Sequence, residues 1–383
     1  MKTRILTIVL TIILFIPTFT SLSSALEIKD TNFDLDVKSA VLMDANTGTI
    51  LYSYNEEESL APASVTKIMT LLLVFEAIEK GSIKYEDMLT VSENAASMGG
   101  SQIFLEPGEE MTVDDLLKSV IVASANDAAL TLAENVGGSE EAFVEMMNKR
   151  AEELNMKNTH FENVTGLDDD VISHLTSAKD IAIMSKELLK YEKVSKYATI
   201  WMDTIRNGEF GLTNTNRLIR FYKGITGLKT GYTSKAGYCV SASAKREGLH
   251  LIAVIMGAES SVARNNAATK LLDYGFAKYS EYSNSEKLGK IKVYGGTKDS
   301  IEIKFNEYKT LLNKGDNNKI EKEIVLEEFI SAPIKKNEEI GKIIYKIDGE
   351  IIGESLIISQ ETVNRITFIE YLLKILKNIF WIM

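Results

Sequence analysis

The chain has 383 residues, enough for two domains or one large one, and 45% of them are hydrophobic, as in a globular protein with a core. Its formal net charge of −11 argues against nucleic acid as the main partner, because phosphate binding needs a basic surface. Cys239 is the only cysteine, so an intramolecular disulfide is impossible, and His160, His174 and His250 lack the spacing of metal ligands. We therefore expect no nucleic acid, metal or cofactor.

The first 25 residues have the pattern of an export signal. Residues 1–4 are a short basic start, an apolar run over residues 5–16 follows, and Ser23-Ser24-Ala25 supplies small residues for cleavage. The apolar run is short for a membrane span. We therefore predict that residues 1–25 are a signal peptide and that the protein is exported.

A hairpin and a buried helix are expected next. Residues 39–43 and 49–54 are strand-like, and turn-forming residues lie between them. Residues 65–78 are apolar on nearly every side, which predicts a buried helix. Pro62 suits its first turn, because proline lacks the N–H that would have no partner there.

Ser64 and Lys67 lie three residues apart at the start of this helix, so they share one helix face. A desolvated lysine loses its charge and acts as a base, and a serine needs such a base to become a nucleophile. Taken alone, the stretch favours a simpler interpretation, in which Ser64 caps the helix and Lys67 extends to water.

Helices are predicted through the middle of the chain and strands after it. Residues 116–123, 128–135, 140–154 and 178–189 have helical patterns. Residues 227–233, 237–244 and 250–256 are strand-like with hairpin-length connections, and residues 265–274 form a closing helix. With the early hairpin, this predicts an α+β fold over residues 26–280: an antiparallel five-stranded sheet flanked by helices, with a helical lobe.

The last hundred residues divide into two parts. Residues 281–360 contain alternating β-branched runs and the hairpin signal Asp348-Gly349, which predict a small all-β domain. Residues 361–383 place polar and apolar side chains on opposite helix faces, and their charges argue against a span. We predict an amphipathic helix that anchors the protein in the membrane interface; the alternative is a helix docked on the protein's own core.

Three short motifs are potentially catalytic. Ser-x-x-Lys occurs only at Ser64-Val65-Thr66-Lys67, and Lys-Thr-Gly occurs only at Lys229-Thr230-Gly231. Ser-x-Asn is less specific, and two of its occurrences, Ser92-Glu93-Asn94 and Ser124-Ala125-Asn126, lie in the helical middle of the chain. We prefer the second, because it lies in a break between helices, whereas Ser92 has the position of a helix cap. A strand lysine or a cap explains each motif singly, but the ordered set on helix, loop and strand is specific.

With these motifs the chain resembles the low-molecular-weight penicillin-binding proteins, which are serine-type D-alanyl-D-alanine carboxypeptidases with a β-lactamase-like fold. The stretches 100–105, 160–167 and 272–276 are also similar to the family. Thr226 stands where many members have an acid, and Tyr232 follows Lys-Thr-Gly where others have histidine. Both differences keep the motif atoms and bear on substrate preference.

The resemblance implies catalytic roles for three residues. Ser64 attacks the carbonyl that joins two D-alanines and forms an acyl-enzyme. Lys67 is the base, kept neutral by desolvation and by the charge of Lys229. Ser124 passes a proton to the leaving amine. The implied partners are peptidoglycan stem peptides ending in D-Ala-D-Ala, and β-lactam antibiotics as covalent inhibitors.

The resemblance also implies substrate-binding roles. Asn126 holds a substrate amide and orients Lys67, while Lys229 and Thr230 bind the terminal carboxylate. The backbone N–H groups of Ser64 and Tyr232 form an oxyanion hole. Gly231 lets the substrate backbone approach an edge strand closely.

Two other functions compete with this one. A β-lactamase of class A uses an extra glutamate for deacylation, and Glu162-Asn163 lacks the expected spacing. The second alternative is a non-catalytic, membrane-tethered protein that binds the cell envelope, against which the intact motifs argue. The expected location is the outer face of the cytoplasmic membrane, where the C-terminal helix holds the protein.

Overall fold

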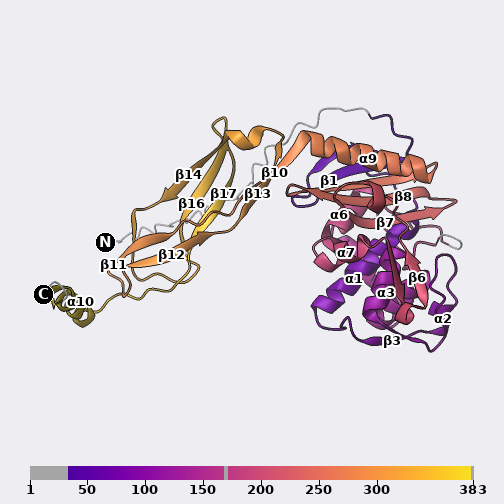
Figure 1. The fold of residues 1–383 in the computed structure, drawn as a ribbon, viewed down its shortest axis with the longest axis horizontal. Helices are drawn as coiled ribbons and strands as arrows, with labels where there is room; N and C mark the ends of the chain where they lie inside the picture. The colour runs from indigo at the N-terminus through magenta and orange to yellow at the C-terminus, as the bar shows by residue number, and fades with distance from the viewer. Residues whose placement is uncertain (1–32, 168–170, 381–383) are drawn as a thin grey trace, which may run out of the picture. The chain divides into compact units, whose positions relative to one another are not determined.

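The structure, a computed structural model, describes residues 33–167 and 171–380 (Figure 1). The predicted signal peptide lies outside the described residues. The chain forms two compact units: the first comprises Ile28–Glu286 with Glu307–Lys319, and the second contains Lys287–Asn306 and Ile320–Met383. The strand β13 (Tyr308–Asn313) belongs to the first unit because it pairs with β10 (Tyr279–Asn284). Local pattern predicted a strand after residue 281 but not which sheet it joins.

An antiparallel five-stranded sheet forms the centre of the first unit, as predicted. Its strand order is β2-β1-β9-β8-β7, which places β7 at one edge. The strands are β1 (Ser39–Asp44), β2 (Ile50–Tyr54), β7 (Ile225–Thr233), β8 (Gly237–Arg246) and β9 (Leu249–Ala258).

Helices cover both faces of this sheet. The long α9 packs on one face, and α6 packs on the other with α1 against it (Figure 1). The helical segments are η1 (Ala63–Thr66), α1 (Lys67–Glu79), α2 (Glu93–Ala96), α3 (Val113–Val122), α4 (Asn126–Gly137), α5 (Glu140–Glu153), α6 (Ala178–Leu188), α7 (Glu192–Ala198), α8 (Leu218–Phe221) and α9 (Ser261–Lys278). The unit also contains two short antiparallel strand pairs. The strand β3 (Met88–Thr90) pairs with β4 (Glu110–Thr112), and β5 (Met202–Ile205) pairs with β6 (Phe210–Thr213) in a hairpin that contains η2 (Arg206–Gly208).

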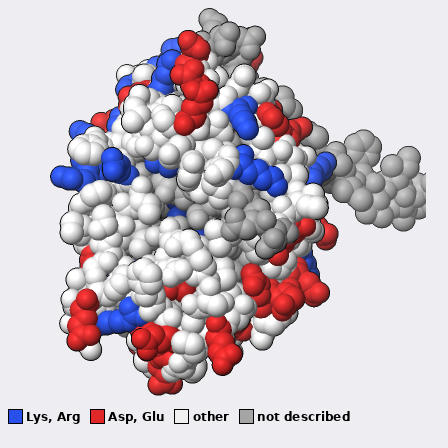
Figure 2. All heavy atoms as spheres, turned by 90° about the vertical axis from the view of Figure 1, so that its right-hand side faces the viewer, with Lys and Arg blue, Asp and Glu red and all other residues white. Residues whose placement is uncertain are grey.

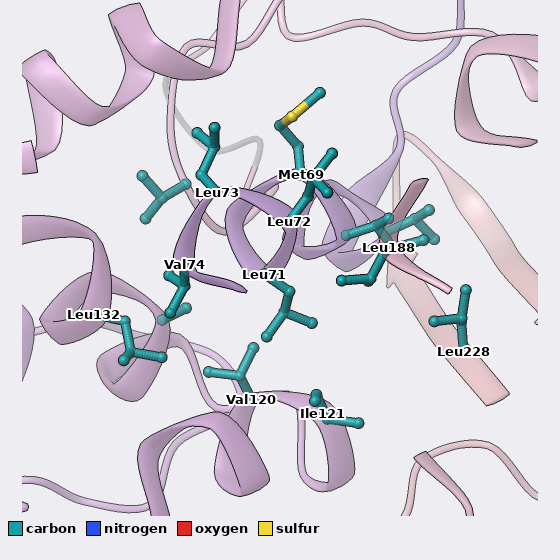
Figure 3. Packing of buried hydrophobic residues seen from close by; sticks show 14 of the residues in the cluster. Met69, Leu71, Leu72, Leu73, Val74, Val120, Ile121, Leu132, Leu188 and Leu228 are labelled. Atoms are coloured by element: carbon teal, nitrogen blue, oxygen red, sulfur yellow. The ribbon is translucent and has the colours of Figure 1, made fainter. Parts of the chain in front are cut away.

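The helix α1 lies in the core, as its apolar sequence predicted. Leu71 points toward α3, where Val120 and Ile121 lie, and Val74 points toward Leu132 of α4 (Figure 3). All five side chains are at most 2% exposed. Because burying such a side chain contributes about 1.5–3 kcal/mol, packing on several sides makes α1 a firm base for the residues at its N-terminal end.

The second unit is a β domain followed by a helix, as predicted. Its six-stranded sheet has the order β14-β16-β17-β12-β11-β15. Asp348 and Gly349, both with positive φ, make the turn between β16 and β17. The elements are β11 (Lys290–Tyr294), β12 (Ser300–Phe305), β14 (Ile320–Leu326), β15 (Phe329–Ser331), β16 (Glu339–Ile347), β17 (Glu350–Ser359) and α10 (Phe368–Phe380); η3 (Asp316–Lys319) belongs to the first unit.

Candidate active site

Ser64 and Lys67 face each other where η1 continues into α1. The Nζ atom of Lys67 lies 3.0 Å from Ser64 Oγ and donates a hydrogen bond to the backbone carbonyl of Thr165 at 2.9 Å. Lys67 is fully buried. The simpler interpretation of the stretch, a capping serine and a solvated lysine, is therefore wrong, because the loop through Thr165 covers Lys67.

The environment of Lys67 disfavours its charge. Burial, and secondly the positive charge of Lys229, hold the pKa of the Lys67 amine well below its usual value, while Asp127 opposes this shift. A neutral amine 3.0 Å from a hydroxyl has the geometry of a general base beside its nucleophile.

The two Ser-x-Asn stretches differ as predicted. Ser92 Oγ accepts the Ala95 N–H at 2.9 Å and is the N-cap of α2. Ser124 instead lies between α3 and α4 and receives a hydrogen bond from Lys229 Nζ at 2.8 Å. Its φ of +64° is unusual for a serine, and the N-cap of α4 is Ala125, with no side-chain cap. The Ser124 stretch therefore joins the site, and the Ser92 stretch does not.

Asn126 is held by the loop that precedes β4. Its backbone N–H donates to Ser101 O and its Nδ2 donates to Gly99 O, both at 2.7 Å. The Oδ1 atom is buried and has no partner within the described part of the chain. Asn126 was expected to orient Lys67, but Lys67 instead donates a hydrogen bond to the Thr165 carbonyl.

The Lys-Thr-Gly motif lies on the edge strand β7. Lys229 is 1% exposed, and burial, followed by the charge of Arg264, lowers its pKa to about 7. Its Nζ atom also donates to Thr230 O at 3.0 Å. The Thr230 hydroxyl donates a hydrogen bond to the Thr215 hydroxyl at 2.8 Å.

Gly231 brings β7 against the turn that carries Ser64. A Cβ atom at this position would lie 2.9 Å from the Ser64 backbone nitrogen and 3.0 Å from Pro62 O, so only glycine permits the approach. Tyr232, the next residue, is 54% exposed, and its ring lies over Tyr238 with 4.3 Å between centroids.

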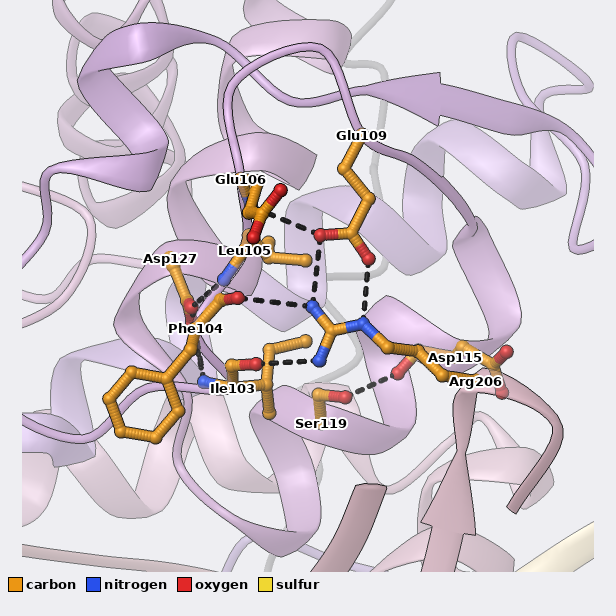
Figure 4. A network of polar contacts seen from close by, with 9 residues as sticks. All are labelled: Ile103, Phe104, Leu105, Glu106, Glu109, Asp115, Ser119, Asp127 and Arg206. Carbon is orange, nitrogen blue, oxygen red and sulfur yellow. Dashed lines mark hydrogen bonds and ion pairs between the residues drawn. The ribbon is translucent and has the colours of Figure 1, made fainter. Parts of the chain in front are cut away.

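A polar network fixes the loop beside Asn126 (Figure 4). The Arg206 guanidinium donates to Glu109 at 2.7 Å and to Ile103 O at 2.8 Å. From the other side, the buried carboxylate of Asp127 accepts the N–H groups of Ile103 (3.0 Å) and Leu105 (3.1 Å). The loop is therefore held from two sides at Ile103, two residues after the Ser101 carbonyl that accepts from Asn126.

Three residues of the site were not identified from the sequence. Thr165 acts through its backbone carbonyl, and any side chain could stand there, so no residue pattern marks it. Thr215 lies in a connection between β6 and α8 that no periodicity distinguishes. Arg264 is a buried arginine (6% exposed) near the start of α9, whose predicted range began one residue later.

The face that Figure 2 shows is hollowed near its centre. Basic atoms are visible at the bottom of the hollow, and acidic side chains gather on the lower part of the face. Within residues 33–167 and 171–380, no cluster of three or more His, Cys, Asp or Glu side chains has the arrangement of a metal site.

A serine beside a buried lysine, next to an edge strand with Lys-Thr-Gly, defines a serine acyl-transferring enzyme with a lysine base. The sequence profile of the D-alanyl-D-alanine carboxypeptidase family (peptidase family S11) matches residues 25–260, and that of the penicillin-binding protein 5 C-terminal domain matches residues 276–365. The chain therefore belongs to the D-alanyl-D-alanine carboxypeptidase family, which confirms the predicted family, fold class and serine-type carboxypeptidase activity.

Individual relatives agree with this assignment. The chain is 48% identical over 345 residues to the D-alanyl-D-alanine carboxypeptidase DacF of Bacillus subtilis (strain 168), and the match covers 88% of each protein. Penicillin-binding protein 5 from Haemophilus influenzae has a TM-score of 0.70 at 32% identity, covering 88% of this chain and 100% of that one. Ampicillin-bound penicillin-binding protein D2 from Listeria monocytogenes has a TM-score of 0.57 at 30% identity, covering 64% and 99%.

Proposed function

We propose that the chain removes the terminal D-alanine of peptidoglycan stem peptides through an acyl-enzyme on Ser64. The observation that carries the proposal is the buried Lys67 amine, 3.0 Å from Ser64 Oγ and held below its usual pKa. Lys67 takes the hydroxyl proton as Ser64 Oγ attacks the carbonyl carbon between the two D-alanines. The peptide C–N bond then breaks, D-alanine leaves, and water later hydrolyses the ester.

Ser124 delivers the proton that the leaving amine needs. Its hydroxyl oxygen accepts a hydrogen bond from Lys229 of the edge strand at 2.8 Å, so the hydroxyl hydrogen can be donated to another group. The Lys229 charge makes the Ser124 hydroxyl a better proton donor, and the hydrogen bond holds it in one orientation. The proton that Lys67 accepts thus reaches the departing nitrogen through Ser124.

The edge strand binds the substrate's C-terminal end. Lys229 and the Thr230 hydroxyl bind the terminal carboxylate by charge-assisted hydrogen bonds, for which the Thr230 hydroxyl turns its hydrogen from Thr215 to the carboxylate. The backbone N–H groups of Ser64 and Tyr232 bind the developing oxyanion, and the close approach at Gly231 brings these two donors together. One such donor contributes about 3 kcal/mol to lowering the barrier.

Asn126 binds the substrate on the opposite wall of the cleft. Its Oδ1 atom is the only oxygen of the motif that is buried without a partner among the described residues. A buried acceptor of this kind is costly unless something donates to it. We assign it to a backbone N–H of the stem peptide.

The same nucleophile accounts for inhibition by β-lactams. Penicillin-binding protein D2 has been solved in ampicillin-bound and cefotaxime-bound forms. We propose that β-lactams acylate this chain at Ser64, with the drug's carboxylate on Lys229 and Thr230. The hydrogen bonds of Ser64 and Lys67 within the described residues include no carboxylate that would activate a deacylating water.

A membrane role for α10 rests on its exposed apolar side chains. Phe368 is 80% exposed, Ile369 70% and Leu373 59%, whereas Lys374 forms an ion pair with Asp299 of the β domain. Across the described residues, no helix has the length and apolarity that crossing a bilayer requires. We propose that α10 lies in the membrane interface and holds the exported protein at the outer face of the cytoplasmic membrane.

The test of the proposed function uses purified protein and a pentapeptide that ends in D-Ala-D-Ala. Wild-type protein should release D-alanine and be labelled by penicillin, and Ser64→Ala should lose both by at least about a thousandfold. Folded wild-type protein without D-alanine release would overturn the proposal. Rapid turnover of penicillin without peptide cleavage would establish the β-lactamase alternative instead.

A further inference from the structure

The residue before the nucleophile has an unusual backbone. Ala63 is buried and has a φ of +49°, in the left-handed region that an alanine rarely adopts. That conformation costs about 1–2 kcal/mol, so neighbouring groups must hold it. The Ala63 carbonyl accepts a hydrogen bond from the Thr66 hydroxyl at 2.9 Å, within the motif that carries Ser64 and Lys67.

A histidine from a distant loop completes this contact. The Nε2 atom of His174 lies 2.8 Å from Thr66 Oγ1, and its Nδ1 atom lies 3.0 Å from the backbone nitrogen of Glu162. Thr66 and His174 are both buried, at 0% and 3% exposure.

The hydrogen bonds that link Glu162, His174, Thr66 and Ala63 have only one possible donor-to-acceptor direction. A backbone N–H can only donate, so Nδ1 of His174 accepts from Glu162 and carries no proton. The ring proton is therefore on Nε2 and is donated to Thr66 Oγ1. Because Thr66 Oγ1 accepts from His174, the single hydrogen of its hydroxyl is available for donation, and it is donated to Ala63 O. Glu162 N–H thus donates to His174, His174 donates to Thr66, and Thr66 donates to the Ala63 carbonyl.

The loop that supplies His174 also touches the active site at two other points. It provides the Thr165 carbonyl to Lys67 and the Val164 carbonyl to Thr70, at 2.9 and 2.7 Å. At Gly166 the loop packs so closely that a Cβ atom would lie 1.9 Å from Ala63 O. The turn before Ser64 is thus held by this loop through packing and through the His174 chain.

We infer that His174 is a positioning residue for catalysis, which acts through Thr66 and Ala63 to set the Ser64 hydroxyl and backbone N–H against Lys67 and the substrate. Its neutral Nε2–H tautomer orients the Thr66 hydroxyl toward Ala63 O. The inference rests on the proposed role of Ser64, and it assigns to His174 no contact with the substrate.

Two substitutions test the two ring nitrogens of His174 one at a time. His174→Gln places an amide N–H near the Nε2 position and keeps the donor to Thr66, but loses the acceptor for Glu162. His174→Asn keeps an acceptor near Nδ1 and loses the donor. We expect His174→Asn to lower kcat and the rate of penicillin acylation about tenfold, the size of one lost buried hydrogen bond. His174→Gln should stay within about threefold of wild type, with KM little changed in both.

Thermal unfolding distinguishes positioning from stability. Both variants lose one hydrogen bond and should unfold at lower temperature, so a purely structural role predicts equal losses of activity. Thr66→Val should reproduce His174→Asn, the double variant should be no worse than the poorer single one, and Thr66→Ser should restore activity. The matched control is His250→Asn, because His250 Nε2 lies 3.0 Å from the Thr226 hydroxyl, in a second histidine–threonine pair.

The outcomes are distinguishable from failure of the proposed function. If wild-type protein is not acylated at Ser64, the proposed function is wrong. If wild type is acylated but His174→Asn and Thr66→Val match it in kcat and acylation rate, the positioning inference is overturned. Equal losses in His174→Gln and His174→Asn would overturn it as well.

Discussion

Two buried lysines with different tasks define the chemistry at the scale of single residues. Burial, then the charge of Lys229, keeps the pKa of Lys67 well below its usual value. Burial, and to a smaller extent the charge of Arg264, lowers the pKa of Lys229 to about 7. The proposed mechanism requires Lys67 to be neutral and Lys229 to be charged, and the two requirements respond oppositely to pH.

We expect a bell-shaped pH profile of kcat/KM. As pH rises, Lys67 loses its proton and becomes a competent base, so the rate rises; near pH 7 Lys229 begins to lose its charge, carboxylate binding weakens and the rate falls. Lys229→Arg keeps the charge and should move the alkaline limb upward, although at a lower maximal rate, because a guanidinium does not match the ammonium geometry. An unchanged alkaline limb in Lys229→Arg would reject the assignment.

The same shift makes stability depend on pH. Below about pH 7 the folded protein buries a charged Lys229, whereas the unfolded chain keeps its proton up to about 10.5. Since the unfolded state binds more protons between these values, the Lys229 contribution should raise the free energy of unfolding as pH increases through that window. Denaturant unfolding of wild type and Lys229→Met at several pH values measures this contribution. Lys229→Met should exceed wild type in free energy of unfolding most at low pH, and this difference should shrink as pH rises.

At the scale of elements, the site depends on how closely the edge strand β7 approaches the turn η1. Local signals predicted both elements, because the apolar run and the alternating strand are readable in sequence. The distance between them depends on Gly231, which allows β7 to lie against the Ser64 backbone. An edge strand can bind substrate backbone on its open side, so a small displacement of β7 would separate the anion-binding residues from the nucleophile.

Gly231→Ala should therefore reduce acylation of Ser64 by about a hundredfold, because a 1 Å misplacement can cost that much. The matched control is Gly211→Ala in β6, where an added Cβ would meet no atom within 4 Å. The rate of penicillin labelling measures both. Equal rates in the two variants would show that close approach at Gly231 is not needed.

At the scale of the whole molecule, the proposed active site and the proposed membrane anchor belong to different units. The proposed catalytic residues Ser64, Lys67 and Ser124 all lie in the first unit, and α10 belongs to the second. We therefore expect the two activities to be separable.

Deleting residues 365–383 should release the protein from phospholipid vesicles and leave D-alanine release from a soluble pentapeptide within about twofold of wild type. Within the helix, Leu373→Glu places a charge on an exposed apolar position and should weaken vesicle binding at least about tenfold. The control is Glu370→Gln on the polar face, which should bind as wild type does. Continued vesicle binding after the deletion would reject the anchor.

The sequence by itself determined the family, the α+β fold and the buried helix behind Ser64, and it favoured Ser124 over Ser92 as the site serine. These features follow from local spacing, since periodicity decides which face is buried and three motifs in order identify a chemistry. Only the tertiary structure decided what holds the motifs: the Thr165 carbonyl on Lys67, Arg264 beside Lys229, His174 behind Thr66, and the pairing of β13 with β10. Such contacts join segments far apart in the chain, often through backbone atoms that every residue type shares, so no pattern of side chains marks them in advance.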